Sequence, residues 1–369
     1  MTQSTSSPLE KLKSDCAVRE RSPNPVAKVE GLAYIVLQRP DLDKATKFFL
    51  DFGLLVDQHR QESVYLRGSS QLHHMVVIER GAPRFSRVGL KASAESVHTL
   101  AQRFNVPVQQ RSGPMGGIYV SLEDPNGLTI EVNHGLSTLS PVEKTKEIPW
   151  NTSGDKPRVN STVRKVVAPP TVHKLGHTVH SVRNMQETVH WYQDTFGLIV
   201  SDFQFLPDDP NPTVAFMRCD LGDTPCDHHT IAVALTPELG HAHTAFEVDS
   251  MEDIAIGKEW MEINKHKHSW GIGRHILGSQ IFDYWRDPDG DLFEHYADGD
   301  QFNADVPTGY HPFNRSAQHQ WGPEMSNNFA GTDKPWQLLK SVIKRLPSDD
   351  ELSFDKLKRL SKAMKPVAE

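Results

Sequence analysis

The chain has 369 residues, which is enough for two or more ordinary domains with sizeable hydrophobic cores. Charged residues make up 24% and apolar residues 37% of the sequence, a balance typical of a soluble globular protein. The net charge of −7 gives no basic footprint for nucleic acid, and no apolar run approaches the roughly 18 residues that cross a membrane.

The first segment, residues 1–28, looks like a polar and mostly disordered leader. Its start, MTQSTSSPLEKLKSD, lacks the apolar core of a signal peptide, so we expect a cytoplasmic protein. The three cysteines of the chain are an odd number and show no CxxC spacing. A disulfide framework or a structural zinc site is therefore not expected.

The chain then repeats itself. Residues 31–57 line up with residues 175–202, and each segment reads as an apolar strand, an amphipathic helix and a Phe-Gly-Leu stop. Asp41 and Asn184 are suitable N-caps for the two helices, and the glycine of each stop suits a C′ position. Three further pairs of segments match in the same order: 72–79 with 227–235, 87–104 with 243–260, and DPNGLTIEV (124–132) with DPDGDLFEHY (287–296).

Each half of the chain thus reads as β-α-β-β-β twice over, with about eight strands, which predicts an α+β fold of two tandem domains. We place these domains at residues 29–135 and 173–300. Residues 136–172 are rich in Pro, Ser, Thr and Lys without a sustained period, which is typical of a linker. Residues 301–369 form a tail with an irregular part and a charged helical pattern at 335–366.

Three pairs of aligned positions carry residues with acid–base or metal-binding chemistry. Two pairs differ between the copies, and the third is a glutamate in both. The pairs are Tyr34 with His177, Arg87 with His243, and Glu131 with Glu294. Only the second copy therefore offers two histidines and a glutamate, on three separate predicted strands. Two imidazoles and one carboxylate on one side of a metal leave open positions on the other, as in non-heme Fe(II) oxygenases. Zinc and manganese tolerate a similar set.

His241 is a rival for one of these ligand positions. It lies two residues from His243, so the two side chains share a face of a regular strand. The repeat register favours His243.

Further polar residues accompany the three candidate ligands. His229 stands in HHTIA and aligns with His74 of the first copy, so a His pair recurs where no metal is expected. His275 and Tyr284 lie on a predicted hairpin, and Ser121 takes the Tyr284 position in the first copy. The latter two are therefore the stronger site candidates by this comparison.

At these residues the sequence resembles the type I extradiol catechol dioxygenases of the vicinal oxygen chelate superfamily. The motifs LGHTV, HHTIA, HAHTAFEV, GRH, FDY and DPDGDLFEHY fall in order, within a match that covers roughly residues 29 to 300. The resemblance implies that paired βαβββ modules form a cup-shaped mixed sheet around a metal. It also implies Fe(II), with Mn(II) as the weaker alternative, held by His177, His243 and Glu294.

The same resemblance implies roles for four other residues. His229 would be the active-site acid and base, and His275 a proton-accepting or hydrogen-bonding partner. Tyr284 would bind the diol through a hydrogen bond, and Val179 would line the substrate pocket. The implied activity is extradiol cleavage, in which both atoms of O₂ enter a catechol-type aromatic diol, and many such relatives are homo-oligomers.

Three other functions compete with this interpretation. A 4-hydroxyphenylpyruvate-type 2-oxo acid dioxygenase uses two histidines and a glutamate but does not call for His229 or the His275–Tyr284 pair. A glyoxalase or epimerase uses the same cup without O₂, and a sequestering protein lacks metal ligands. The tail motif HQWGPEM could close over the pocket, but packing on the surface is the favoured expectation.

Overall fold

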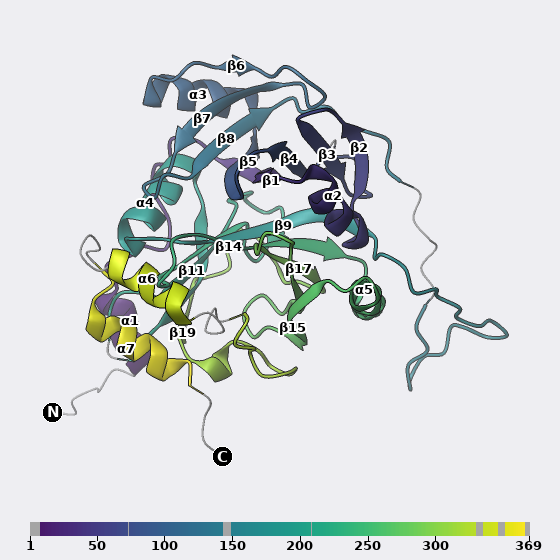
Figure 1. Ribbon diagram of the computed structural model, residues 1–369. Helices are drawn as coiled ribbons and strands as arrows, with labels where there is room; N and C mark the ends of the chain where they lie inside the picture. Colours follow the sequence, from purple (N-terminus) through teal and green to yellow (C-terminus); the bar gives the residue numbers. More distant parts are fainter. Residues whose placement is uncertain are drawn as a thin grey trace.

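The computed structural model describes residues 8–72, 74–142, 149–207, 209–329, 335–345 and 351–365. Figure 1 shows the first half of the chain, in dark blue, above the second half, in teal and green. Within the described ranges, no helix combines the length and the apolar character that crossing a membrane requires.

The first half forms one mixed sheet of eight strands in the order β2-β3-β4-β1-β5-β8-β7-β6. Its elements are β1 (Val29–Arg39), α2 (Leu42–Asp51), β2 (Leu55–His59), β3 (Ser63–Arg67), β4 (Val76–Arg80), β5 (Arg84–Ala92), α3 (Ala94–Phe104), β6 (Gln109–Gln110), β7 (Ile118–Glu123) and β8 (Thr129–His134). β1 and β5 run antiparallel at the centre, and each is parallel to the strand that closes its own βαβββ module, β4 or β8.

The second half repeats this arrangement in a sheet of nine strands, ordered β15-β16-β17-β14-β9-β13-β11-β10-β19. Its elements are β9 (Val172–Ser181), α4 (Met185–Phe196), β10 (Ile199–Phe205), β11 (Val214–Arg218), β12 (Cys226–Asp227), β13 (Ile231–Ala234), β14 (Gly240–Val248), α5 (Met251–Ile263), β15 (Lys267–Arg274), β16 (Ile281–Arg286), β17 (Leu292–Ala297), β18 (Gln301–Phe302) and β19 (Gly309–Pro312). The central pair is β9 and β14, antiparallel to each other. The paired modules confirm the predicted α+β fold, and we keep the domain limits as a proposal.

The helices begin and end where the sequence predicts. The Asp41 side chain accepts a hydrogen bond from a backbone N–H of the first turn of α2, and Asn184 does the same for α4. Gly197 ends α4 with φ of 68°, a left-handed conformation that glycine adopts without steric cost. The apolar faces of both helices are buried, which fixes each helix against its sheet.

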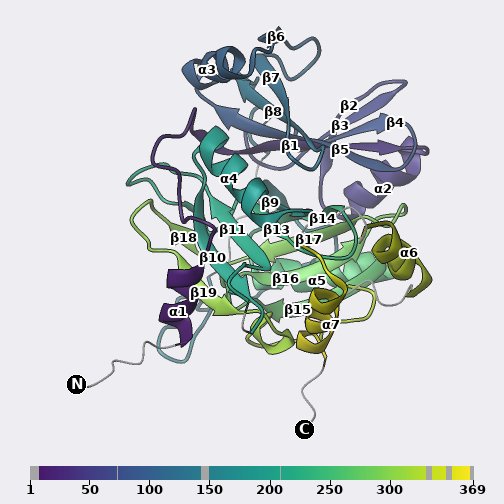
Figure 2. The same ribbon diagram turned by 90° about the vertical axis from the view of Figure 1, so that its left-hand side faces the viewer.

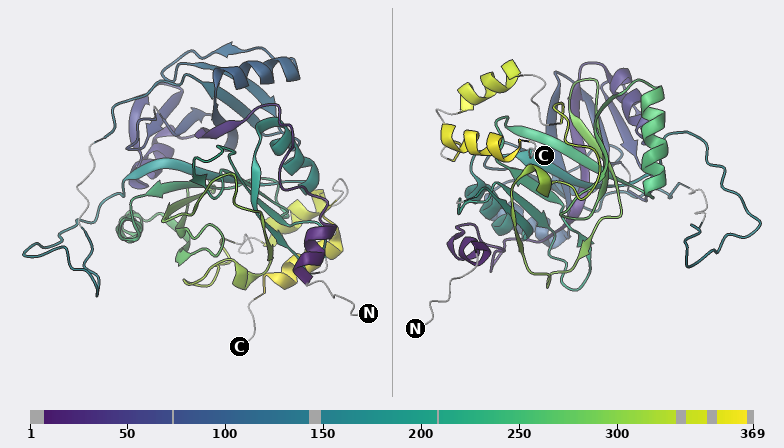
Figure 3. Two further views of the ribbon diagram at one scale, coloured as in Figure 1. Left: turned by 180° about the vertical axis from the view of Figure 1, so that it is seen from behind. Right: turned by 90° about the horizontal axis from the view of Figure 1, so that it is seen from below.

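The leader and the tail pack against the second half (Figures 1 and 2). The remaining elements are α1 (Pro8–Asp15), the 3₁₀ turn η1 (Arg315–Ala317), α6 (Pro335–Arg345) and α7 (Phe354–Ala363). Val18 is buried in the main core, and Arg19 donates to the Gln193 side chain of α4 at 2.9 Å. The expectation of a mostly disordered leader is therefore wrong for residues 8–28, because these contacts anchor it. Residues 149–164, by contrast, loop away from both halves (Figure 3), and the chain returns at Lys165, which pairs with Glu252 and Asp253 of the second half.

The two halves share one hydrophobic core and a buried ion-pair cluster. Phe52 of the first half lies edge-on against Phe246 and stacks on His295, with ring centroids 5.7 and 3.6 Å apart. The fully buried Arg39, at the end of β1, donates to Asp287 at 2.9 Å and to Asp291 at 2.5 Å. These aspartates belong to the DPDGD turn that precedes β17.

The equivalent turn of the first half makes the reciprocal contact. Tyr192 of α4 donates to the Asp124 carboxylate at 3.1 Å, and the Asn126 side chain donates to Thr188 at 3.0 Å. Each copy of the repeated DP(N/D)G turn therefore also holds the other half of the molecule.

Removing Arg39 should destabilise the protein strongly. Arg39→Ala leaves the buried Asp287 carboxylate without its cation, and breaking a buried pair on one side typically costs about 3–5 kcal/mol. The measurement is the free energy of unfolding in urea. The control is Arg80→Ala, whose pair with Glu62 is exposed and should contribute less than about 1 kcal/mol. Equal losses in the two variants would contradict the anchoring role of Arg39.

Candidate metal centre

The three predicted ligands lie on three neighbouring strands, β9, β14 and β17, with β14 in the middle. In the strand register, Ala245 of β14 is opposite both His177 of β9 and Glu294 of β17. His177 and Glu294 therefore stand at the same level on either side of β14. His243 lies on β14 itself, two residues before Ala245. The sheet thus converts three distant sequence positions into one cluster of side chains.

The ligand atoms form a nearly equilateral triangle. The Glu294 Oε2 atom lies 3.3 Å from His177 Nε2 and 3.4 Å from His243 Nε2, and the two nitrogen atoms are 3.3 Å apart. Among the described residues, this is the group whose ligand atoms lie close enough together to hold a metal ion. Three ligands on one face leave the opposite positions of an ion free for substrates.

The chemistry of this donor set fits a divalent cation. The Glu294 side chain is 0% exposed, and neither carboxylate oxygen accepts a hydrogen bond from the described part of the chain. An ionised carboxylate in that setting costs several kcal/mol unless a cation compensates it. Burial, followed by the neighbouring imidazoles, lowers the pKa of His243 well below its ordinary value, so its lone pair is available to a metal.

His241 does not join this cluster, although a regular strand would place it beside His243. The pairing of β14 with β9 shifts register between these two residues, which is a β-bulge. The His241 ring instead stacks on Phe85 of the first half, with centroids 4.1 Å apart, and its Nδ1 atom lies 3.2 Å from Asp291. The bulge therefore decides between the two candidate ligands in favour of His243.

In the first half, the charge of the equivalent buried glutamate is balanced by side chains of the protein. Its buried Glu131 accepts from the Tyr34 hydroxyl and pairs with two guanidinium groups, Arg111 at 3.0 Å and Arg87 at 3.3 Å. Two cations thus occupy the neighbourhood that would otherwise need an ion. This arrangement explains why the glutamate recurs in both copies while the histidines do not.

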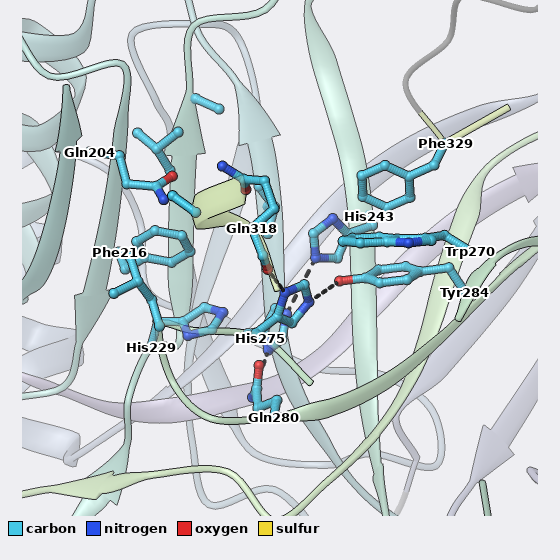
Figure 4. Close-up of a pocket in the computed structure, with 16 residues that line it drawn as sticks. Gln204, Phe216, His229, His243, Trp270, His275, Gln280, Tyr284, Gln318 and Phe329 are labelled. Atoms are coloured by element: carbon cyan, nitrogen blue, oxygen red, sulfur yellow. Dashed lines mark hydrogen bonds between the residues drawn. The ribbon is translucent and has the colours of Figure 1, made fainter. Parts of the chain in front are cut away.

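The ligand triangle opens into a cavity of about 190 Å³ (Figure 4). Its walls include the predicted site residues His177, Val179, His229, His243, His275 and Tyr284. Glu294 lies behind this wall, fully buried. Aromatic and apolar side chains make up much of the rest: Val214, Phe216, Ala234, Trp270, Leu277, Ala317 and Phe329. The cavity therefore offers apolar walls for a ring and polar groups beside the ligands.

His275 and Tyr284 form a fixed pair at the mouth of the triangle. The His275 Nδ1–H donates to the backbone carbonyl of Gln318 at 2.7 Å, which leaves Nε2 as the acceptor for the Tyr284 hydroxyl at 2.9 Å. The Tyr284 ring lies edge-on to His243, with centroids 5.3 Å apart. Burial, together with the Glu294 charge, raises the pKa of Tyr284 well above its ordinary value, so the hydroxyl stays protonated.

His229 stands on the other side of the triangle. Its ring centroid is 4.0 Å from that of His177, and the side chain is buried. Burial, and then the surrounding imidazoles, lower its pKa well below the ordinary value, so the resting ring is neutral. A neutral imidazole beside the open face can take up a proton and return it.

The tail contributes to the site in a way that sequence reasoning missed. Trp270 Nε1 donates to the Pro323 carbonyl at 2.8 Å, and both Gln318 and Phe329 line the cavity. Within HQWGPEM itself, residues 320–324 are exposed, as surface packing predicts, and the cavity is reached by the flanking residues Gln318 and Phe329. Gln280, which also escaped notice, has its side-chain nitrogen 3.5 Å from His177 Nδ1. The first copy has no counterpart of the tail, so the repeat gave no signal for Gln318 and Phe329.

Substitution of the ligands should separate His243 from its rivals. We expect His243→Ala to lose stoichiometric metal, because only two ligand atoms would remain. His241→Ala and Arg87→Ala should keep the metal, since neither side chain reaches the triangle. Metal content after iron loading and desalting, measured by elemental analysis, checks this. Unchanged metal in His243→Ala would refute the assignment, and loss in His241→Ala alone would move the ligand by two residues.

The sequence of residues 174–295 matches the family described as the Glyoxalase/Bleomycin resistance protein/Dioxygenase superfamily. Metapyrocatechase 2 of Cupriavidus necator is 26% identical over 326 residues, which cover 86% of this chain and 97% of the relative. An iron-dependent extradiol dioxygenase of Rhodococcus jostii (strain RHA1) is 25% identical over 198 residues, which cover 49% of this chain and 56% of that relative.

Solved structures share the fold at lower sequence identity. An anaerobic substrate complex of homoprotocatechuate 2,3-dioxygenase from Brevibacterium fuscum superposes with a TM-score of 0.68 at 18% identity, covering 84% of this chain and 94% of that one. The Mn(II)-bound glyoxalase from Novosphingobium aromaticivorans superposes with a TM-score of 0.67 at 21% identity, covering 82% and 94%. The comparisons confirm the resemblance of the chain to type I extradiol dioxygenases.

Proposed function

We propose that this protein is an extradiol ring-cleaving dioxygenase that inserts both atoms of O₂ into a catechol-type aromatic diol. The observation that carries the proposal is the open face of the ligand triangle, which meets the cavity between His229 on one side and the His275–Tyr284 pair on the other. A relative named metapyrocatechase, matched over 97% of its own length, supports the same activity.

The proposed metal is Fe(II), held by His177, His243 and Glu294. Neutral imidazoles and one carboxylate suit this ion, and the relative from Rhodococcus jostii is named an iron-dependent enzyme. Fe(II) held there would be chelated by the diol, would ease its deprotonation and would conduct electrons from the diol to O₂.

The residues of the chain would do the remaining work. On diol binding, Tyr284 would turn its one hydroxyl proton from His275 Nε2 to a diol oxygen and so fix the ring relative to the ligands. His229 takes a proton as oxygen adds and returns it as the O–O bond breaks. Phe216 and Trp270 wall the cavity with apolar surface, which orients an aromatic ring and excludes water.

The fold alone does not distinguish this activity from that of a non-oxidative relative, because the Mn(II)-bound glyoxalase superposes equally well. The side chains favour the oxygenase. His229, His275 and Tyr284 place three hydrogen-bonding groups around the ligand set, which the 2-oxo acid alternative does not call for.

A diol screen on an oxygen electrode tests the activity directly. With Fe(II)-loaded protein, catechol-type substrates should consume O₂ and give a yellow ring-fission product that absorbs visible light, because cleavage beside the diol leaves a conjugated 2-hydroxymuconic product. Protein without Fe(II) is the control. A dicarboxylic muconate product, or O₂ uptake with 2-oxo acids alone, would contradict the proposal.

Replacing His229 should separate proton transfer from metal binding. His229→Phe should keep iron and diol binding but lose turnover by about 10²–10⁴-fold, the usual contribution of a general acid–base group. The matched control is His74→Phe at the aligned position of the first half, which should leave turnover unchanged.

Turnover under saturating diol and the iron content are measured for both variants. Equal damage by the two substitutions would make both His pairs structural. Loss of iron from His229→Phe would make His229 a ligand.

A further inference from the structure

A chain of hydrogen bonds leads from His229 to the surface of the molecule. His229 Nδ1 lies 3.0 Å from Nδ1 of the adjacent His228, whose Nε2 lies 2.5 Å from the Asp202 carboxylate. The second Asp202 oxygen accepts from His311 Nε2 at 2.8 Å. His228 is fully enclosed, whereas the His311 side chain is 37% exposed, so the chain connects the cavity wall with solvent.

Close packing holds these residues in place. Phe216 and Phe302 enclose the His228 ring, with centroids 5.8 and 5.2 Å away. Asp202 on β10 is paired with Gly309 on β19, and a Cβ atom at Gly309 would collide with the Asp202 carboxylate and the His311 ring. Glycine is therefore the residue that lets the tail strand lie close enough for His311 to reach Asp202.

The positions of the protons along these hydrogen bonds follow from the Asp202 carboxylate, which can only accept when it is ionised. Burial would raise the pKa of Asp202, but hydrogen bonds from His228 and His311 outweigh it and lower the pKa, so the carboxylate is ionised. An ionised carboxylate only accepts, so His228 must carry its proton on Nε2. A His228 ring that holds this one proton presents Nδ1 as an acceptor, to which His229 would donate from its own Nδ1–H.

We infer that Asp202 and His228 are positioning residues that hold His229 in the tautomer with a proton on Nδ1 and a lone pair on Nε2. The inference rests on the proposed role of His229 as acid and base and explains how that ring is kept ready to accept a proton. A carboxylate that sets a histidine tautomer is established chemistry in other enzymes. In this protein His228 lies between the carboxylate and His229. Asp202 therefore sets the tautomer of His228, and His228 in turn sets the tautomer of His229.

The second proton-handling histidine is fixed in the same manner from the same part of the chain. His275 donates its Nδ1–H to the Gln318 carbonyl, so it too presents Nε2 to the cavity. Both contacts involve residues after β18: His311 on the Asp202 carboxylate and Gln318 on His275. The tail therefore contributes to the tautomers on both sides of the ligand triangle.

Nitrogen NMR of the histidine rings tests the inference without relying on turnover. The full-length chain is labelled with ¹⁵N-histidine and loaded with Zn(II), a diamagnetic ion that the same ligands accept. Signals of His229 are assigned by their absence from His229→Phe. The wild-type ring should be protonated on Nδ1, with an unprotonated Nε2. A proton on Nε2 in the wild type overturns the inference, whatever the variants show.

Asp202→Ala tests the cause. The inference predicts that the His229 signals shift toward the Nε2–H tautomer and that kcat of the Fe(II) enzyme falls by about 10-fold or more, with the roughly 10²–10⁴-fold contribution of general acid–base catalysis as the upper bound. KM and metal content should stay unchanged. The matched control is Asp51→Ala, which removes another buried aspartate that accepts from a histidine, His266, at 2.7 Å, away from the cavity.

The two ways of failing are distinguishable. An unchanged His229 tautomer in Asp202→Ala, or an equal loss of kcat in Asp51→Ala, would overturn the positioning role. Absence of ring cleavage by the wild-type Fe(II) enzyme, with the expected tautomer present, would overturn the proposed function and leave the positioning of His229 standing.

Discussion

A buried glutamate in the last strand of each repeat, β8 or β17, is the constraint around which both halves are organised. Glu131 and Glu294 occupy equivalent places, and both are removed from water. The first half neutralises its glutamate with Arg87 and Arg111. The second offers two imidazoles in place of guanidinium cations, a donor set that could hold a metal ion to supply the missing charge. One duplicated fold therefore contains an internally neutralised copy and a copy whose ligand atoms suit a metal ion.

The same duplication accounts for the cohesion of the molecule. The DP(N/D)G turn that leads into the glutamate strand is anchored in the opposite half each time, through Arg39 in one direction and Tyr192 in the other. Because the turn and the ligand lie on the same short stretch of chain, the contact between the halves also fixes the strand that carries Glu294. Packing of the metal-free half is thus connected to the geometry of the site.

Much of this site could be predicted from the sequence, because a tandem repeat supplies an internal comparison. The register between copies identifies His177, His243 and Glu294 and marks Tyr284 as different from Ser121. Strand periodicity failed to reject His241, because a bulge breaks the alternation at that point. No local pattern could place Gln318 on His275 or His311 on Asp202, since these contacts join segments far apart in the sequence and outside the repeat.

The central claim is that the ligand triangle and its proton-handling neighbours direct both oxygen atoms of O₂ into an aromatic diol. The most direct measurement is the mass of the product that the Fe(II)-loaded enzyme forms from catechol in a single turnover under ¹⁸O₂. The account predicts a ring-opened product that carries both labelled atoms, before any exchange with water. A product with one labelled atom and release of CO₂, or one formed without O₂, would contradict it.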